Sequence, residues 1–148
     1  MRYLFLLVLS FILDINAQQI IEKEGHFYEN DQLFTGKIVE LKDGNISKEI
    51  FLRKGKIHKK VRFYYDNGKI KEEGSYYKGN KQGSWYLWNN KGIMLSKANY
   101  VKGIKEGTWE VWDDNKTLRC QMHYKKGKKT GVWKQWNEQA KLINEKEY

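Results

Sequence analysis

All six tryptophans of this 148-residue chain lie on one regular grid, with a period of 24 positions. They form three pairs, each one period beyond the last: Trp85 and Trp88, Trp109 and Trp112, Trp133 and Trp136. The same period connects two further series: Tyr76, Tyr100, Tyr124 and Tyr148, and Gly55, Gly79, Gly103 and Gly127. A fixed period of this length predicts a repeat protein, in which each unit packs on its neighbours along the chain.

Upstream of Trp85 the grid continues in a weaker form. Val61 and Tyr64 stand at the tryptophan positions, and Lys59 stands where later units have Gly83. Atypical outer units are expected in an array, because an end unit packs against only one neighbour. We therefore predict one repeat domain over residues 18–148, with strong repeats over 82–148 and degenerate repeats over 28–81.

Residues 1–17 do not follow the grid. Arg2 gives a positive start, an apolar run from Tyr3 to Leu13 is too short to span a bilayer, and Ala17 offers a small residue for cleavage before Gln18. This pattern predicts a signal peptide over residues 1–17 and a periplasmic or extracellular protein. A retained membrane anchor and a wrongly assigned start codon are the alternatives.

Glycine-containing turns predict β-hairpins. Asn67-Gly68 favours a two-residue turn that pairs Tyr65 with Ile70, and a second turn at Gly79-Asn80 would place Tyr76 opposite Gly83. About twelve residues for each strand and turn then give roughly ten strands. The predicted fold is all-β, an antiparallel up-and-down meander of repeated hairpins in a single twisted sheet.

The two tryptophans of each pair are expected on opposite faces of this sheet, because their separation is an odd number of strand steps. The first of each pair belongs to the core face, and Trp85 is expected opposite Gly74. The opposite face is mostly polar and is predicted to carry the ion pairs Arg62–Glu73 and Lys134–Glu145. It also carries an outer aromatic row, which consists of Tyr64, Trp88, Trp112 and Trp136.

The pattern Gly83-x-Trp85-x-x-Trp88-x-x-x-Gly92, followed by Tyr100-x-x-Gly103-x-x-x-Gly107, resembles the MORN-repeat variant of bacterial secreted and cytosolic proteins. The resemblance extends from about Phe34 to Tyr148, although Lys116 and Ala140 replace the turn glycine. It implies an open hairpin array that binds proteins or lipid headgroups, and relatives are often labelled antitoxin components. It implies neither catalytic residues nor a cofactor.

Lysines gather at the turns of the Tyr-x-x-Gly type, in a chain of net charge +10. The candidate binding residues there, which we call the lysine edge, are Lys78, Lys81, Lys102, Lys105, Lys125, Lys126, Lys128 and Lys129; Lys54, Lys56, Lys59 and Lys60 extend the series upstream. Such an edge attracts anionic partners. The alternative is that these lysines only keep the turns soluble and the sheet edges protected.

The outer aromatic row is the second candidate binding surface, because evenly spaced rings can stack on sugars or on apolar side chains of a partner. The alternative is packing within the molecule. In that case Trp88, Trp112 and Trp136 would lie on their predicted cross-strand neighbours, which are Leu95, Arg119 and Ile143.

Residues that support catalysis or metal binding are sparse. His26, His58 and His123 are far apart on the grid, and the single cysteine, Cys120, is expected on the core face opposite Val111 as a buried, inert thiol. The sequence contains no nucleophile elbow, phosphate-binding glycine loop or paired-cysteine zinc motif. We therefore expect no enzymatic activity, cofactor or metal.

These observations favour a secreted or periplasmic interaction module that binds a protein partner or an anionic lipid or glycan of the envelope. The main alternative is an antitoxin or immunity-type protein that sequesters a cognate toxin, and an envelope enzyme is a third. A basic chain with many aromatic residues also suits nucleic acid. Export argues against that partner.

Overall fold

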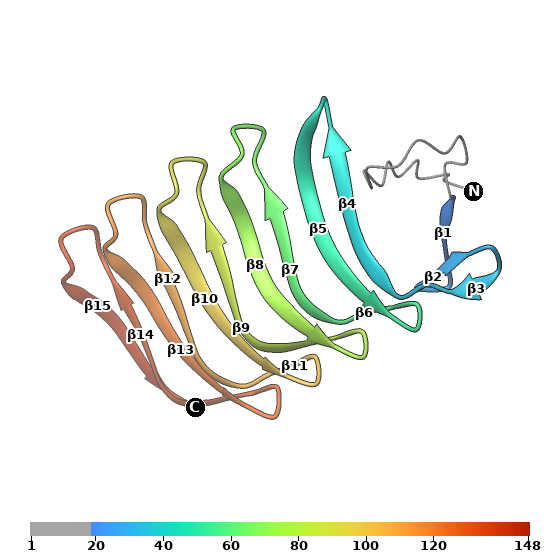
Figure 1. Ribbon diagram of the computed structural model, residues 1–148. Coiled ribbons are helices and arrows are strands. Elements are labelled where there is room, and N and C mark those ends of the chain that lie inside the picture. Colours follow the sequence, from blue (N-terminus) through green and yellow to red (C-terminus); the bar gives the residue numbers. More distant parts are fainter. Residues whose placement is uncertain (1–18) are drawn as a thin grey trace.

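The computed structural model describes residues 19–148, which form fifteen β-strands (Figure 1). The predicted signal peptide lies outside the described residues. The strands are β1 Ile20–Lys23, β2 His26–Glu29, β3 Gln32–Leu33, β4 Gly36–Lys42, β5 Asn45–Arg53, β6 Lys56–Ile57, β7 Lys59–Tyr64, β8 Ile70–Tyr77, β9 Asn80–Trp88, β10 Met94–Val101, β11 Ile104–Lys105, β12 Gly107–Trp112, β13 Leu118–Lys125, β14 Lys128–Trp136 and β15 Leu142–Glu147.

A 12-stranded antiparallel sheet forms most of the molecule. Its main path runs β15-β14-β13-β12-β10-β9-β8-β7-β5-β4, with β11 on β10 and β6 on β5. The hairpins lie side by side in a row of arched strands, and the sheet is not closed (Figure 1). The predicted hairpin meander is confirmed. A separate three-stranded sheet of β1, β2 and β3, which the sequence did not predict, stands at the N-terminal end.

Within residues 19–148, no helix is long and apolar enough to cross a membrane.

One set of turns connects β5 to β6, β8 to β9, β10 to β11 and β13 to β14. In the second of these, Tyr77 pairs with Asn80, so the two turn residues are Lys78 and Gly79, with φ of +50° and +82°. These angles suit a two-residue turn that matches the strand twist. The predicted Gly79-Asn80 turn is therefore wrong by one residue.

The turn glycines also join successive repeats. The backbone N–H of Gly79 donates to the carbonyl of Ile57 at 3.0 Å. The same contact recurs in each of the next two units, from Gly103 to Lys81 at 2.8 Å and from Gly127 to Lys105 at 3.0 Å. Each of these turns therefore docks on the preceding unit, which explains why the period is kept so strictly at this end of the strands.

At the opposite ends of the strands, the loops that follow β7, β9, β12 and β14 are one residue longer than predicted. The N–H of Tyr65 donates to the carbonyl of Lys69 at 2.9 Å, and Gly68 has a φ of +77°. This is a three-residue loop that ends in a left-handed residue. As a result Tyr64, rather than Tyr65, pairs with Ile70.

The register beyond these loops is largely as predicted. Arg62 pairs with Glu73, and Trp85 lies against Gly74, where a Cβ atom would overlap the indole ring. The expected pair of Tyr76 and Gly83 is wrong, because the shifted turn places Tyr76 opposite Lys81. The register between β8 and β9 then shifts, so that Glu73 faces Tyr86 as the predicted register requires.

The buried core lies toward the N-terminal end of the sheet and consists of Ile20, Phe27, Ile38, Ile50, Leu52, Val61 and Trp85. Two of these residues come from the three-stranded sheet, which is tied to the β5–β6 turn by hydrogen bonds. The N–H of Phe27 donates to the carbonyl of Gly55 at 2.9 Å, and the N–H of Gly55 donates to the carbonyl of Phe34 at 2.8 Å. The small sheet thus covers one end of the core. From residue 86 to residue 148 no side chain is fully buried.

Candidate binding surfaces

One face of the large sheet carries a continuous aromatic ladder. Neighbouring rings have centroids 4.8–6.4 Å apart. Each indole N–H donates to a backbone carbonyl; for Trp109 the acceptor is Asn99 at 3.0 Å. These bonds fix the ring orientation, so the ladder is built into the fold. Its members, in order, are Tyr76, Trp85, Tyr100, Trp109, Tyr124, Trp133 and Tyr148.

Three residues of the lysine edge lie over this ladder. The ammonium of Lys81 is 3.7 Å from the ring centroid of Trp85, that of Lys105 is 4.4 Å from Trp109, and that of Lys129 is 4.5 Å from Trp133. Each also approaches the next tyrosine ring within 5.3 Å. Cation–π contacts of this kind hold the lysine stems across the rings and partly shield them from water.

The remaining residues of the lysine edge are exposed at or beside the turns; they are Lys78, Lys102, Lys125, Lys126 and Lys128. Within the described part of the chain none of them forms an ion pair. On the strands, in contrast, charges are largely compensated: Lys48 binds Glu40 at 2.7 Å, and Arg62 binds Glu73 at 2.7 Å. Lys81 of the lysine edge pairs with Glu72 at 3.5 Å, and the Glu106 carboxylate accepts a hydrogen bond from the backbone N–H of Lys126 at 2.7 Å. The other turn lysines leave an excess of positive charge along the row of turns at this end of the strands.

The predicted pair of Lys134 and Glu145 also forms on the polar face, at 3.6 Å.

The carboxylate of Glu49 accepts hydrogen bonds from Lys37 at 2.6 Å and from the hydroxyl of Tyr64 at 2.5 Å. The bond from Lys37, followed by that from Tyr64, lowers the pKa of the Glu49 carboxyl. Burial, and then the hydrogen bond to Glu49, raises the pKa of Tyr64. This tyrosine is therefore held within the polar face.

The outer aromatic row is half-buried at all four positions. Its predicted neighbours are wrong by one residue, because register shifts precede each tryptophan: Trp88 pairs with Met94, Trp112 with Leu118 and Trp136 with Leu142. Packing thus accounts for part of each ring. The rest of each ring is exposed to solvent.

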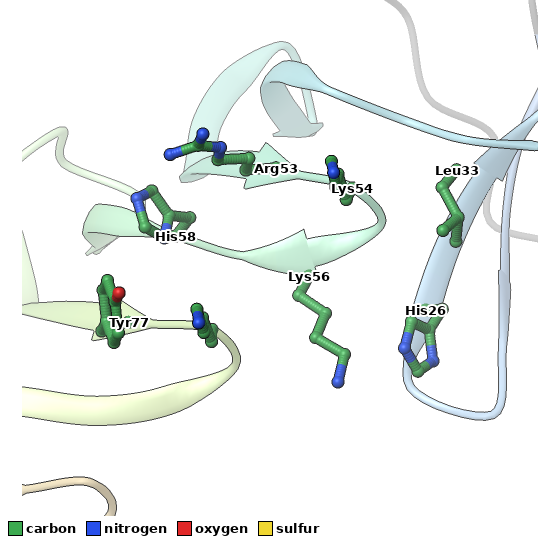
Figure 2. Close-up of a pocket in the computed structure, with 8 residues that line it drawn as sticks. His26, Leu33, Arg53, Lys54, Lys56, His58 and Tyr77 are labelled. Carbon is green, nitrogen blue, oxygen red and sulfur yellow. The ribbon is translucent and has the colours of Figure 1, made fainter.

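A pocket of about 490 Å³ lies where the three-stranded sheet meets the first turns of the large sheet (Figure 2). Figure 2 shows His26 and Leu33 on one side and His58 and Tyr77 on the other. The cationic side chains of the lining are Arg53, Lys54, Lys56 and Lys78, and no carboxylate contributes to it. Only Lys78 of these residues belongs to the lysine edge.

The pocket was not predicted from the sequence. His26 and His58 are far apart along the chain, and one of the two walls comes from the separate three-stranded sheet. Arg53 stands where the later units have Tyr77, Val101 and Lys125, but this departure from the grid gave no indication of a cavity.

The other reactive side chains remain isolated. Cys120 pairs with Val111 as predicted, but it is half-buried rather than buried, since Val111 itself is 36% exposed on the open part of the face. His123 contacts the hydroxyl of Thr108 at 3.2 Å. Residues 19–148 contain no cluster of three or more side chains suited to a metal ion.

Comparison with protein families matches residues 57–78 and 105–126 to the model of the MORN repeat variant. The matched segments include Tyr76 and Lys78 in one repeat and Tyr124, Lys125 and Lys126 in the other, and each ends one residue before its turn glycine, Gly79 or Gly127. These two segments are thus similar to MORN-variant repeats. This family is generally a non-catalytic repeat module. No curated protein matches the sequence.

Among solved structures, one titled "Crystal structure of GtfA/B complex bound to UDP and GlcNAc" aligns with 96% of this chain at 10% identity and a TM-score of 0.31. The alignment covers 26% of that protein's chain. A likeness of this size gives no indication of activity.

Proposed function

We propose that this protein is an exported, non-enzymatic binding module whose lysine edge binds an anionic component of the cell envelope. One observation carries the proposal: lysines recur at successive turns on one edge of the sheet, and those at the turn tips form no ion pair with the described carboxylates. Uncompensated charge attracts an anionic partner more strongly than charge already bound to a carboxylate.

The rigid repeat supports this function. Each turn glycine bonds to the preceding unit, so the backbone that carries the lysines forms a fixed row and only the side chains have to be ordered on binding. Close to an acidic membrane each basic residue contributes about 1 kcal/mol. Several turns acting together therefore give useful affinity, although each exposed lysine is weak alone.

The outer aromatic row is proposed as a second contact surface. Part of each indole is available at Trp88, Trp112 and Trp136, on the face opposite the ladder. Rings in this arrangement stack on sugar rings or on apolar groups near the headgroups.

Export is part of the proposal, because the anionic component lies outside the cytoplasm. Expressed with its own leader in a Gram-negative host, the protein should be found outside the cytoplasm with Gln18 as its first residue. N-terminal sequencing of the cell fractions checks this. Recovery of chains that begin at Met1 in the cytosol contradicts export.

The lysine edge is tested by binding to vesicles of acidic phospholipid. Replacing Lys125, Lys126, Lys128 and Lys129 by glutamine should weaken sedimentation with phosphatidylglycerol vesicles by at least about tenfold, given roughly 1 kcal/mol for each charge. Raising the salt from physiological strength to about 1 M should abolish binding, since the screening length falls to about 3 Å.

The matched control removes the same charge elsewhere, at Lys37, Lys42, Lys69 and Lys97. Thermal melting of both variants checks that the sheet is intact. Equal weakening by the two sets means that net charge alone acts, and the edge is then not a site. The alternative function, sequestration of a cognate toxin, predicts instead that the protein binds the product of an adjacent reading frame.

A further inference from the structure

We infer that the pocket between the three-stranded sheet and the β5–β6 and β8–β9 turns binds a small organic phosphate. The phosphate would contact the cationic side chains of the lining, and a ring of the same ligand would rest on its apolar wall. The volume of about 490 Å³ is that of a small-molecule site. This inference goes beyond the proposed function, because Arg53, Lys54 and Lys56 lie outside the lysine edge.

The charge of the lining selects an anion. Four arginine or lysine side chains and two histidines line the cavity, and no carboxylate lines it. A phosphate monoester carries roughly two negative charges at neutral pH, so it can accept charge-assisted hydrogen bonds from several of these groups at once.

Arg53 is the group best suited to the phosphate. The other two arginines in the described part of the chain bind carboxylates: Arg62 binds Glu73 at 2.7 Å, and Arg119 binds Asp113 at 3.2 Å. Arg53 forms no such pair with a described residue, and it lies in the pocket wall. A planar guanidinium binds two phosphate oxygens at once, which a lysine cannot do.

The pocket is preformed. Leu33 lies against Gly55, where a Cβ atom would come within 2.6 Å of the Leu33 side chain. The stem of Lys56 lies against Gly79 in the next turn, where a Cβ atom would be 3.7 Å from the Cδ atom of Lys56. These contacts fix the two walls and the turn relative to each other, so the shape of the pocket is set before a ligand binds.

The apolar part of the lining fits a ring. The rings of His58 and Tyr77 lie beside each other, with centroids 5.5 Å apart, and Leu33 is on the far side of the space (Figure 2). An aromatic or sugar ring attached to the phosphate can rest against the His58 and Tyr77 rings. The inferred ligand class is therefore a ring-bearing phosphate monoester, either free or at the end of a lipid headgroup.

Titration calorimetry with phenyl phosphate tests the site on the mature chain. Changing Arg53 and Lys56 to glutamine should weaken binding by at least about tenfold, because two charge-assisted contacts are lost. Lys125 and Lys128 form the matched control. They are the same cross-strand pair three units later, without the second wall. Their replacement should change affinity less than about twofold for a site outside their reach.

A third variant tests the ring. Tyr77→Ser should weaken phenyl phosphate and leave inorganic phosphate unaffected. Circular dichroism and thermal melting confirm that each variant is folded. No binding to the unchanged protein, or equal weakening by the Arg53 and Lys125 pairs, overturns the inference.

The source of the phosphate is distinguished by competition. The edge variant with four glutamines is used here, so that the lysine edge does not itself hold the protein on acidic vesicles. If the natural ligand is a lipid headgroup, phenyl phosphate should displace this variant from vesicles that contain phosphatidylinositol 4-phosphate, whose headgroup is a ring with a phosphate monoester. If it is a soluble phosphate, phenyl phosphate should bind without displacing the variant from those vesicles. The edge variant with four glutamines should retain phenyl phosphate binding in either case. The failure of the lysine edge and the failure of the pocket are therefore distinguishable.

Discussion

The two tryptophans of each repeat have different environments, although they are close neighbours in sequence. Trp109 lies in the ladder between Tyr100 and Tyr124, with its N–H bonded to a backbone carbonyl. Trp112 is on the other face and pairs with Leu118. The alternation of side chains along a strand predicted this division from the sequence. It could not predict that lysine ammonium groups would lie over the first row.

Alanine substitutions should give graded losses of stability. Trp85 is 4% exposed, so Trp85→Ala should lower the free energy of unfolding by about 3–5 kcal/mol. Trp109→Ala should cost less, because that ring is only half-buried. Trp112→Ala should cost least, because no cation and no second ring lies over its indole among the described contacts. Urea denaturation followed by circular dichroism measures all three.

Equal losses at Trp109 and Trp112 would contradict this order. They would mean that both faces of the sheet are covered in solution.

At the scale of elements, the hairpin loops explain where the strand pairing predicted from the sequence was wrong. The strands and the paired residues in their middle were predictable, because apolar and polar side chains alternate. The turn type was not, since Asn67-Gly68 suits both a two-residue and a three-residue loop. The additional loop residue shifts the pairing beside it, which is why the predicted neighbours of the outer aromatic row were each wrong by one position.

The left-handed position of these loops gives a direct test. It is occupied by Gly68, Gly92, Lys116 and Ala140, and Ala140 has a φ of +57°. A Cβ atom is strained there, so Ala140→Gly should raise the free energy of unfolding by about 1 kcal/mol. Thermal unfolding measures the change.

Gly92→Ala is the matched control, because it makes the reverse substitution at the same position of an earlier loop. It should lower stability by a similar amount. A stabilising Gly92→Ala or a destabilising Ala140→Gly would show that the loops do not keep this backbone conformation in solution.

At the scale of the molecule, the two ends of the array differ. The N-terminal sheet closes the core with Ile20 and Phe27, whereas every residue of β15 is exposed. The repeat grid predicted the row of hairpins and the lysine edge, and the family resemblance implied an open array. Neither could predict the closing sheet or the pocket beside it, because residues 20–27 precede the first repeat and the period does not show that β2 and β3 leave the large sheet.

The hydrogen bonds from each turn glycine to the preceding unit limit how the chain can change in length. Their donors are one period apart, and so are their acceptors, Ile57, Lys81 and Lys105. Removing or duplicating one whole unit would therefore join each donor to an equivalent acceptor, and the row of lysines would only become shorter or longer. A gain or loss of another length within the paired strands would move a glycine away from its carbonyl. The row of turns can therefore become longer or shorter only by whole repeats.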